Sequence, residues 1–366
     1  MIGQSHGNPT ERELHGGHQE TGPVTRPISV LIPAHNEEEY ISRCIASVIR
    51  TGWPREQLEV IVIDNCSTDS TAGHARQAGA DVLHAPAGRI GSVRNVGLSA
   101  AKGEFVAYVD GDCEVPATWL HTAIELLQSQ PCLGAVGGPC LAPVDGTWVQ
   151  RSLAPTKTGS GAVKPARAIA TSSFIARTSL LREVGGFDES LVSGEDDDMS
   201  NRIQSRGLTV VSAADCHIIH HGYPKTWLDV FKKEIWHGRH HLEVRTKFDL
   251  TLILTFVFLL TSIALPVLAV ENLLLPGIRS FYALLLCALF QFAPPFLFAW
   301  KRIRQSSGEW RLTLPALAVG YAYFAGHSLG VLANLQERIL FRRRGTPRPA
   351  ASNSSDSARG HQRSME

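Results

Sequence analysis

The sequence predicts an α/β protein with a mostly parallel sheet, followed by helices that cross a membrane. Between Pro27 and residue 112, short apolar runs alternate with amphipathic stretches, which is the pattern of βαβ units. Acidic residues directly follow two of these runs, at Asp64 and Asp110. From Leu250 onward the composition changes to long uncharged apolar runs, the signature of membrane-spanning helices.

Size and composition set the outer bounds. The chain has 366 residues, enough for one large domain or two ordinary ones. Its formal net charge of +1 provides no basic field for nucleic acid, so no nucleic-acid partner is expected. The seven cysteines are scattered without a CxxC pair, which predicts reduced thiols and neither a disulfide framework nor a zinc site.

The N-terminal region contains a predicted tail and the first βαβ unit. Residues 1–26 are rich in Gly, His, Glu and Thr without periodicity, and we expect them to be disordered. Residues 28–32 read as a buried strand, and Pro33 begins a turn. Asn36 with Glu39 three residues on has the spacing of a capping box, which predicts that a helix starts there.

Further strands and helices follow in alternation. Residues 59–63 form a second predicted strand that ends at Asp64, and a weaker strand lies near 80–83. Residues 91–101 are expected to be helical and lead into the strand that ends at Asp110. Ligands of such sheets bind outside the carboxyl ends of the strands, so both acidic positions are expected to face a ligand.

The segment Asp110-Gly111-Asp112 is the most informative stretch. Two carboxylates one residue apart at a strand end converge on one point, and a divalent cation is the usual partner of such a pair. Carboxylate oxygens suit Mg²⁺ or Mn²⁺, which commonly hold a diphosphate. The alternative is a solvated turn, since Asp-Gly is a common turn pair.

Three apolar runs occupy the C-terminal third. Residues 250–270 and 281–300 are long enough to cross about 30 Å of hydrocarbon, with Pro294-Pro295 expected to break the second. Residues 312–335, which contain several glycines and His327, either span, re-enter or lie at the interface. The alternative for all three is core helices of a soluble protein. Residues after about 345 are expected to be disordered.

Charge predicts the orientation. Basic residues precede the first apolar run and follow the second, whereas the connection between these runs carries only Arg279. The positive-inside rule therefore places the N-terminal α/β region on the cytoplasmic side of a cell (inner) membrane, in a multi-pass protein. Arg342-Arg343-Arg344 conflicts with a simple three-span arrangement, since it would lie outside. The stretch with Trp227, Phe231 and Trp236 is interpreted as an interfacial helix, with core packing as the alternative.

Five features in order carry a family resemblance. They are the turn Pro33–Glu39, the segment Asp64–Asp69, the segment Gly88–Gly97, Asp110–Asp112, and the pair of segments Gly185–Glu189 and Gly194–Arg202. Together they resemble family 2 glycosyltransferases of the GT-A fold over residues 28–240. This implies a Rossmann-like GT-A catalytic domain at 27–240, followed by a membrane region with two or three helices at 241–344.

The resemblance implies a nucleotide-sugar site. The turn containing Pro33, His35 and Glu37 matches the motif that lines the nucleotide pocket, although Glu37 also suits a helix start. Asp64 matches the acid that contacts the base, usually uracil, and Arg94-Asn95 matches a pair whose Arg steadies the diphosphate. The family's metal-and-ribose motif falls on Asp110, Gly111 and Asp112, with Mg²⁺ or Mn²⁺ as cofactor, and His220 is a weaker metal candidate.

The resemblance also implies the general base. Glu195-Asp196 matches the family's base pair, and the register makes Asp196 the base that accepts the proton of the acceptor in an inverting reaction. Asp198 and Arg202 lie at i,i+4 spacing and are expected to pair. Without the resemblance, this segment reads as a solvated acidic helix start.

The acceptor is predicted from a difference between this sequence and the processive members of the family. The Gln-x-x-Arg-Trp motif of processive relatives is absent, and this segment reads Lys233–Arg239, so we expect one sugar to be added per encounter. Membrane spans beside a sugar-transfer domain suggest a lipid-linked saccharide or polyprenyl phosphate, in polysaccharide biosynthesis. The alternatives are a nucleotidyltransferase on a similar sheet and a degenerate binding protein.

Overall fold

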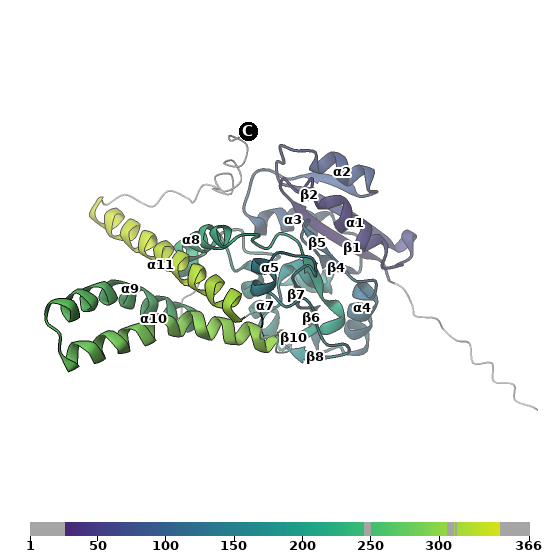
Figure 1. Cartoon of the computed structure of the whole chain (residues 1–366). Coiled ribbons are helices and arrows are strands. Elements are labelled where there is room, and N and C mark those ends of the chain that lie inside the picture. Colours follow the sequence, from purple (N-terminus) through teal and green to yellow (C-terminus); the bar gives the residue numbers. More distant parts are fainter. Residues whose placement is uncertain (1–25, 245–249, 306–310, 312, 345–366) are drawn as a thin grey trace, which may run out of the picture.

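The computed structural model describes residues 26–244, 250–305, 311 and 313–344. Figure 1 shows an α/β body from which a hairpin of two long helices projects, with a third long helix beside it. The predictions of disorder for the two tails lie outside the described residues, apart from Arg26.

An eight-stranded sheet forms the centre of the body, in the order β3-β2-β1-β4-β9-β6-β10-β8. The pairs β1–β2, β2–β3, β1–β4 and β6–β10 are parallel, and β9 is antiparallel to both β4 and β6. A small second sheet has the order β5-β11-β7. The strands are β1 Ile28–Ala34, β2 Leu58–Asp64, β3 Asp81–His84, β4 Phe105–Tyr108, β5 Cys113–Glu114, β6 Leu133–Gly137, β7 Cys140–Leu141, β8 Val163–Pro165, β9 Phe174–Arg177, β10 Thr209–Ala213 and β11 Ile218–His220.

Helices cover both faces of the large sheet. One hydrophobic core contains buried side chains of α1 and α4, and the other contains those of α3, α6 and α7. The body helices are α1 Ile41–Ile49, α2 Thr71–Gln77, α3 Ile90–Ala100, α4 Trp119–Ser129, α5 Trp148–Leu153, α6 Thr178–Glu183 and α7 Glu195–Gln204. This confirms the predicted α/β class with a mostly parallel sheet.

The predicted capping box at Asn36 is wrong. The helix α1 begins only at Ile41, and Asn36 has φ 57°, outside helical geometry. Its side-chain oxygen accepts from the Thr68 amide at 2.8 Å, in the loop after the neighbouring strand. The long-range contact therefore takes the side chain that the local pattern assigned to a helix cap.

Four long helices follow the body: α8 Trp227–Val244, α9 Leu250–Leu274, α10 Ile278–Gln305 and α11 Thr313–Arg344. The predicted boundary after residue 240 falls inside α8. Among the described residues, three stretches are long and apolar enough to cross a membrane: Leu250–Leu274, Ile278–Arg304 and Thr313–Gln336. The expected break at Pro294-Pro295 does not occur, since α10 continues through both residues.

Candidate active site

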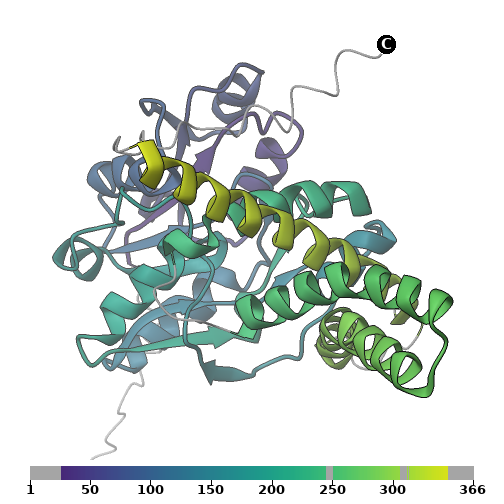
Figure 2. The same cartoon turned by 90° about the vertical axis from the view of Figure 1, so that its left-hand side faces the viewer.

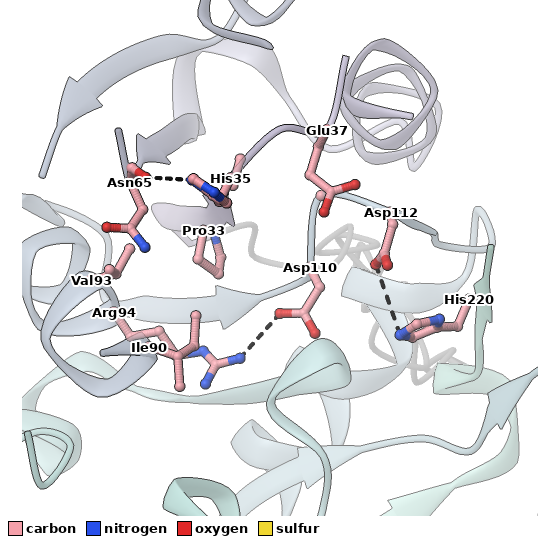
Figure 3. Close-up of a pocket in the computed structure, with 12 residues that line it drawn as sticks. Pro33, His35, Glu37, Asn65, Ile90, Val93, Arg94, Asp110, Asp112 and His220 are labelled. Atoms are coloured by element: carbon pink, nitrogen blue, oxygen red, sulfur yellow. Dashed lines mark hydrogen bonds and ion pairs between the residues drawn. The ribbon is translucent and has the colours of Figure 1, made fainter. Parts of the chain in front are cut away.

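The carboxyl ends of β1, β2 and β4 open into one cavity, as the parallel pairing requires. Figure 3 shows the side chains of Glu37, Asp110 and Asp112 around this opening, with Arg94 and His220 on either side. The lining residues are Pro33, Ala34, His35, Glu37, Asn65, Ile90, Val93, Arg94, Asp110, Gly111, Asp112 and His220. Eight of the residues predicted from the sequence are among them.

Two loops are braced against each other at this edge. The His35 ring nitrogen Nδ1 lies 2.7 Å from the carbonyl oxygen of Asn65, and the Asn36 amide donates to the Ser67 hydroxyl at 3.0 Å. Asn36 and Cys66 both have φ 57°, a conformation that residues other than glycine rarely adopt. Strained backbone persists where surrounding contacts enforce it, and such positions cluster at functional sites.

Arg94 joins the two acidic motifs of the site. Its side chain is buried, with Nη2 donating to Asp110 Oδ1 at 3.1 Å and Nη1 donating to Glu195 Oε1 at 2.7 Å. Burial alone would lower the pKa of Arg94, but Asp110 and Glu195 outweigh burial and raise it. The guanidinium also lies 5.6 Å from the centre of the Phe187 ring. The sequence predicted a diphosphate contact for Arg94 and contained no signal for this bridge.

Asp112 and His220 form a second cluster. His220 Nε2 lies 3.9 Å from Asp112 Oδ1, and the ligand atoms of Asp112, Cys113 and His220, one from each residue, lie within 4.8 Å of one another. The backbone of the loop after β11 closes on Asp112, whose carbonyl oxygen accepts from the His221 amide at 2.9 Å. His220 Nδ1 is buried and has no hydrogen-bond partner among the described residues.

The chemistry of these side chains indicates which of them suits a cation. Burial raises the pKa of the Cys113 thiol well above its ordinary value, and thiolate sulfur suits softer metals than Mg²⁺ or Mn²⁺. Asp112 and His220 therefore provide carboxylate and imidazole donors, a set compatible with Mn²⁺. Burial also raises the pKa of Asp110, against the opposing effect of Arg94.

Glu195 and Asp196 begin α7. The preceding Gly194 has φ 80°, a left-handed conformation that glycine tolerates, and it turns the chain into the helix. Burial, with the neighbouring Glu195 charge, raises the pKa of Asp196 to about 6. A carboxyl whose pKa lies near neutrality is suited to general-base chemistry. The expected pair between Asp198 and Arg202 forms, with a contact of 2.7 Å.

Asp64 ends β2 but is not among the lining residues. It is 3% exposed, its Oδ1 accepts from the Ser67 amide at 3.2 Å, and its Oδ2 lies 3.0 Å from His84 Nδ1. His84 ends the adjacent strand β3 and was not predicted, since a lone histidine after a weak strand carries no signal. Asn65 does line the cavity, and its position directly after Asp64 could have indicated it.

Asn95 and the predicted general-base pair, Glu195 and Asp196, also lie outside the lining. The Asn95 amide donates to the Phe187 carbonyl at 2.9 Å and to Glu189 Oε1 at 2.8 Å, and its oxygen accepts from the Phe187 amide at 2.8 Å. Asn95 therefore holds the turn that precedes α7. Glu195 still reaches the site through Arg94, whereas Asp196 Oδ1 accepts from the Asp197 amide at 2.8 Å.

Comparisons with known proteins agree with this geometry. Residues 29–185 match the family model described as glycosyl transferase family 2. The chain is 28% identical over 226 residues to the glycosyltransferase AglE of Haloferax volcanii, a match that covers 59% of this chain and 73% of AglE. It is also 28% identical over 200 residues to the pre-mycofactocin glycosyltransferase of Mycobacterium tuberculosis, covering 51% of this chain and 41% of that protein.

A solved structure shares the fold. The mannosyltransferase PcManGT from Pyrobaculum calidifontis, in complex with GDP-Man and Mn²⁺, aligns with a TM-score of 0.51 and 18% identity. The alignment covers 86% of this chain and 89% of PcManGT. The body thus has a GT-A-like fold with three apolar helices after it. Residues 29–185 therefore match a glycosyl transferase family 2 domain, and this match, together with the curated relatives, supports a glycosyltransferase.

Proposed function

We propose that the protein moves a sugar from a nucleoside-diphosphate sugar, UDP-linked, to a hydroxyl or phosphate of a membrane-associated acceptor, with inversion. The observation that carries this proposal is the convergence around Arg94, which bonds both Asp110 and Glu195 beside Asp112 and His220. The acceptor is a lipid-linked saccharide or a polyprenyl phosphate. The sugar is a hexose or a related residue.

The donor lies along the edge formed by β1, β2 and β4. The two loops that contain His35 and Asn65 hold the nucleoside. The Ser67 amide orients the Asp64 carboxylate, which accepts a hydrogen bond from the imide N–H of uracil, as the family's motif implies. The diphosphate lies toward Asp110 and Asp112. Arg94 contributes positive charge here, although Asp110 and Glu195 already use its donors.

The residues around Asp112 fit a divalent cation, Mg²⁺ or Mn²⁺. Asp112 and Asp110 supply carboxylates, and the buried, unpartnered His220 Nδ1 marks a ring whose other nitrogen already faces Asp112. When bound, such a cation neutralises charge that develops on the leaving diphosphate. Asp112 is held ready for this by the His221 amide.

Asp196 is the proposed general base. The acceptor oxygen attacks the anomeric carbon, its proton passes to Asp196, and the bond from the anomeric carbon to the phosphate oxygen breaks. A single displacement of this kind inverts the anomeric centre. The pKa of about 6 leaves Asp196 mostly ionised at pH 7 and able to accept the proton.

The membrane location is supported by the α9–α10 hairpin. Only 11% and 22% of the most apolar stretches of α9 and α10 are buried, and the exposed side chains are almost all apolar. A helix that is apolar all round needs an apolar surrounding. We place the hairpin in the bilayer and the catalytic body on the cytoplasmic side, because basic residues flank both of its body-side ends.

The test uses the full chain in detergent or nanodiscs. Thermal unfolding is followed with UDP- and GDP-sugars and Mg²⁺ or Mn²⁺, since a ligand that binds only the folded state raises the apparent stability. The best donor is then incubated with polyprenyl phosphate and with lipid-linked saccharide. We expect metal-dependent release of free nucleoside diphosphate and a glycosylated lipid.

Matched variants separate chemistry from binding. Asp196→Asn should abolish transfer and leave the donor-induced thermal shift nearly intact, whereas Asp112→Asn should remove both. Asp197→Asn, one residue along the same helix, is the control and should keep most activity. Release of pyrophosphate would indicate a nucleotidyltransferase instead, and donor binding without any turnover would indicate a degenerate binding protein.

A further inference from the structure

We propose that α11 lies along the membrane surface instead of crossing it, and that an apolar stripe on its outer face contacts the lipid bilayer. This inference rests on the membrane insertion of α9 and α10 proposed above. The sequence left three arrangements open for this helix, and its hydropathy alone fits a span. The packing of α11 decides between them.

The outer face of α11 carries one apolar stripe. Leu314, Tyr321, Leu329 and Leu332 are 77%, 43%, 49% and 39% exposed, and their spacing of seven, eight and three residues keeps them on one side of a helix. In contrast, 56% of the apolar stretch of α11 is buried, far more than in α9 or α10. This helix therefore packs on protein with one face and shows apolar side chains on the other.

The buried face of α11 packs directly on the backbone of α8. A Cβ added to Gly326 would lie 2.4 Å from the Phe231 carbonyl oxygen, and one added to Gly330 would lie 2.2 Å from that of Ile235. On the other side, a Cβ on Gly238 would lie 2.2 Å from the His327 carbonyl oxygen. Glycines allow this close approach, as they do between tightly packed helices. The two helices run in the same direction over this contact.

Polar bonds fix the rotation of α11. Glu234 is buried, with Oε2 3.1 Å from His327 Nδ1 and Oε1 3.1 Å from His237 Nδ1. Burial would raise the pKa of Glu234, but the bonds to His237 and His327 outweigh burial and lower it, so the carboxylate stays charged. Further along, Asn334 Nδ2 donates to the Arg239 carbonyl at 2.6 Å. These contacts hold the polar face of α11 inward and its apolar stripe outward.

The depth of α11 follows from α8. The outer side of α8 exposes charged residues, including Lys232, Lys233 and Arg239, each of which would cost about 2.5–3.5 kcal/mol at the centre of a bilayer. Residues 326–334 of α11 lie beside this charged helix, so this part of α11 lies at the membrane surface and not at the centre of the hydrocarbon. The preceding residues 313–325 extend only about 20 Å at 1.5 Å per residue, which is short of the roughly 30 Å needed.

The residues around the apolar stripe of α11 indicate that the lipid bilayer covers it. Tyr321, in the stripe, packs 5.1 Å from Phe258 of α9, and Ser328 donates to the Thr255 carbonyl at 3.4 Å. The stripe is thus continuous with the exposed apolar surface of the hairpin, and Figure 2 shows α11 lying across the body and meeting the hairpin near one end. This arrangement also puts Arg342-Arg343-Arg344 on the same side as the catalytic body, which agrees with the positive-inside rule.

The test is the accessibility of single cysteines in the full chain. The exposed native thiols are first removed by Cys66→Ser and Cys132→Ser. Reporters are then placed by Gly277→Cys between α9 and α10, by Gly159→Cys in the body and by Ser354→Cys after α11. Spheroplasts are treated with a membrane-impermeant maleimide, intact or permeabilised. We expect the maleimide to label Gly277→Cys in intact spheroplasts. Labelling of Gly159→Cys and Ser354→Cys should increase at least tenfold on permeabilisation.

The outcomes separate the two proposals. Labelling of Ser354→Cys in intact spheroplasts alongside Gly277→Cys would show that α11 crosses the membrane, and would overturn this inference alone. Labelling of Gly277→Cys only after permeabilisation would overturn the insertion of the hairpin, and with it the membrane part of the proposed function.

A second measurement tests the lipid contact itself. Spin labels attached at Leu314→Cys and Leu332→Cys in nanodiscs should be accessible to oxygen and should lie at the membrane interface. Their depths in the bilayer should differ by less than one helical turn, about 5 Å. A span would separate these positions by about 27 Å along its axis. A label at Lys233→Cys is the water-exposed control. Depths at Leu314 and Leu332 equal to that control would mean that lipid does not cover the stripe.

Discussion

Replacing Arg94 by methionine is expected to destabilise the catalytic body strongly. Methionine keeps an unbranched apolar stem against Phe187 but removes the charge that bonds Asp110 and Glu195. Removing one partner of a buried ion pair leaves uncompensated charge and costs about 3–5 kcal/mol. At roughly 2–4 °C per kcal/mol for a body of this size, the melting temperature should fall by about 6–20 °C.

The assay is thermal unfolding of the detergent-solubilised chain, compared with a double variant. Glu195→Gln added to Arg94→Met removes one of the two carboxylates that lost their partner, so it should recover part of the lost melting temperature. The difference from additivity measures the coupling energy between residues 94 and 195. Arg202→Met is the control, since its pair with Asp198 is partly exposed and should be worth no more than about 1 kcal/mol.

The pH dependence provides a further check. Arg94 opposes the rise in the pKa of Asp110 that burial causes, so Asp110 takes up a proton more readily without it, and the deficit of Arg94→Met should shrink as the pH falls toward 4. The reasoning would be refuted if Arg94→Met melted within 2 °C of the parent at pH 7.5, or if Glu195→Gln added to its loss in full.

Three further predictions follow from the site. Because Asp196 must be ionised to act as base and its pKa is about 6, log kcat/KM should rise with unit slope below pH 6 and level off above it; a flat profile from pH 5 to 8 would contradict this role. The folded-state pKa of Asp196 lies above its unfolded value of 3.8, so the stability of the fold should decline as the pH rises from about 4 through 6. At pH 7.5, Asp196→Asn should therefore raise the free energy of unfolding by up to about 3 kcal/mol and raise the melting temperature. An unchanged or lower melting temperature would argue against the burial of this carboxylate. Finally, a Cβ on Gly222 would lie 1.8 Å from Asp112 Oδ2, so Gly222→Ala should weaken Mn²⁺ binding, measured by calorimetry, at least tenfold. Gly159→Ala, whose Cβ would meet open space, is the control and should bind Mn²⁺ normally. Equal affinities of the two variants would place the metal elsewhere.

Local pattern was enough to predict the scaffold. Apolar runs bounded by turns and acids predicted β1, β2 and β4, because a strand buried on both faces must be apolar along its length. Since parallel strands end at one edge, Asp64, Asp110 and Asp112 were expected to face a ligand there. Asp110 and Asp112 line the cavity, whereas Asp64 does not. The apolar runs that became α9 and α10 were read from length and composition alone.

Tertiary structure decided how distant segments meet. Arg94 and Glu195 are 101 positions apart, and no local pattern records that their side chains bond. Asn36 left its predicted helix cap because the loop after β2 offered a partner, and β9 entered the sheet antiparallel between β4 and β6. For α11, hydropathy reports only the average affinity of a helix for lipid. Which face is buried, and against what, depends on the charged neighbour α8, and that is a property of the packed molecule.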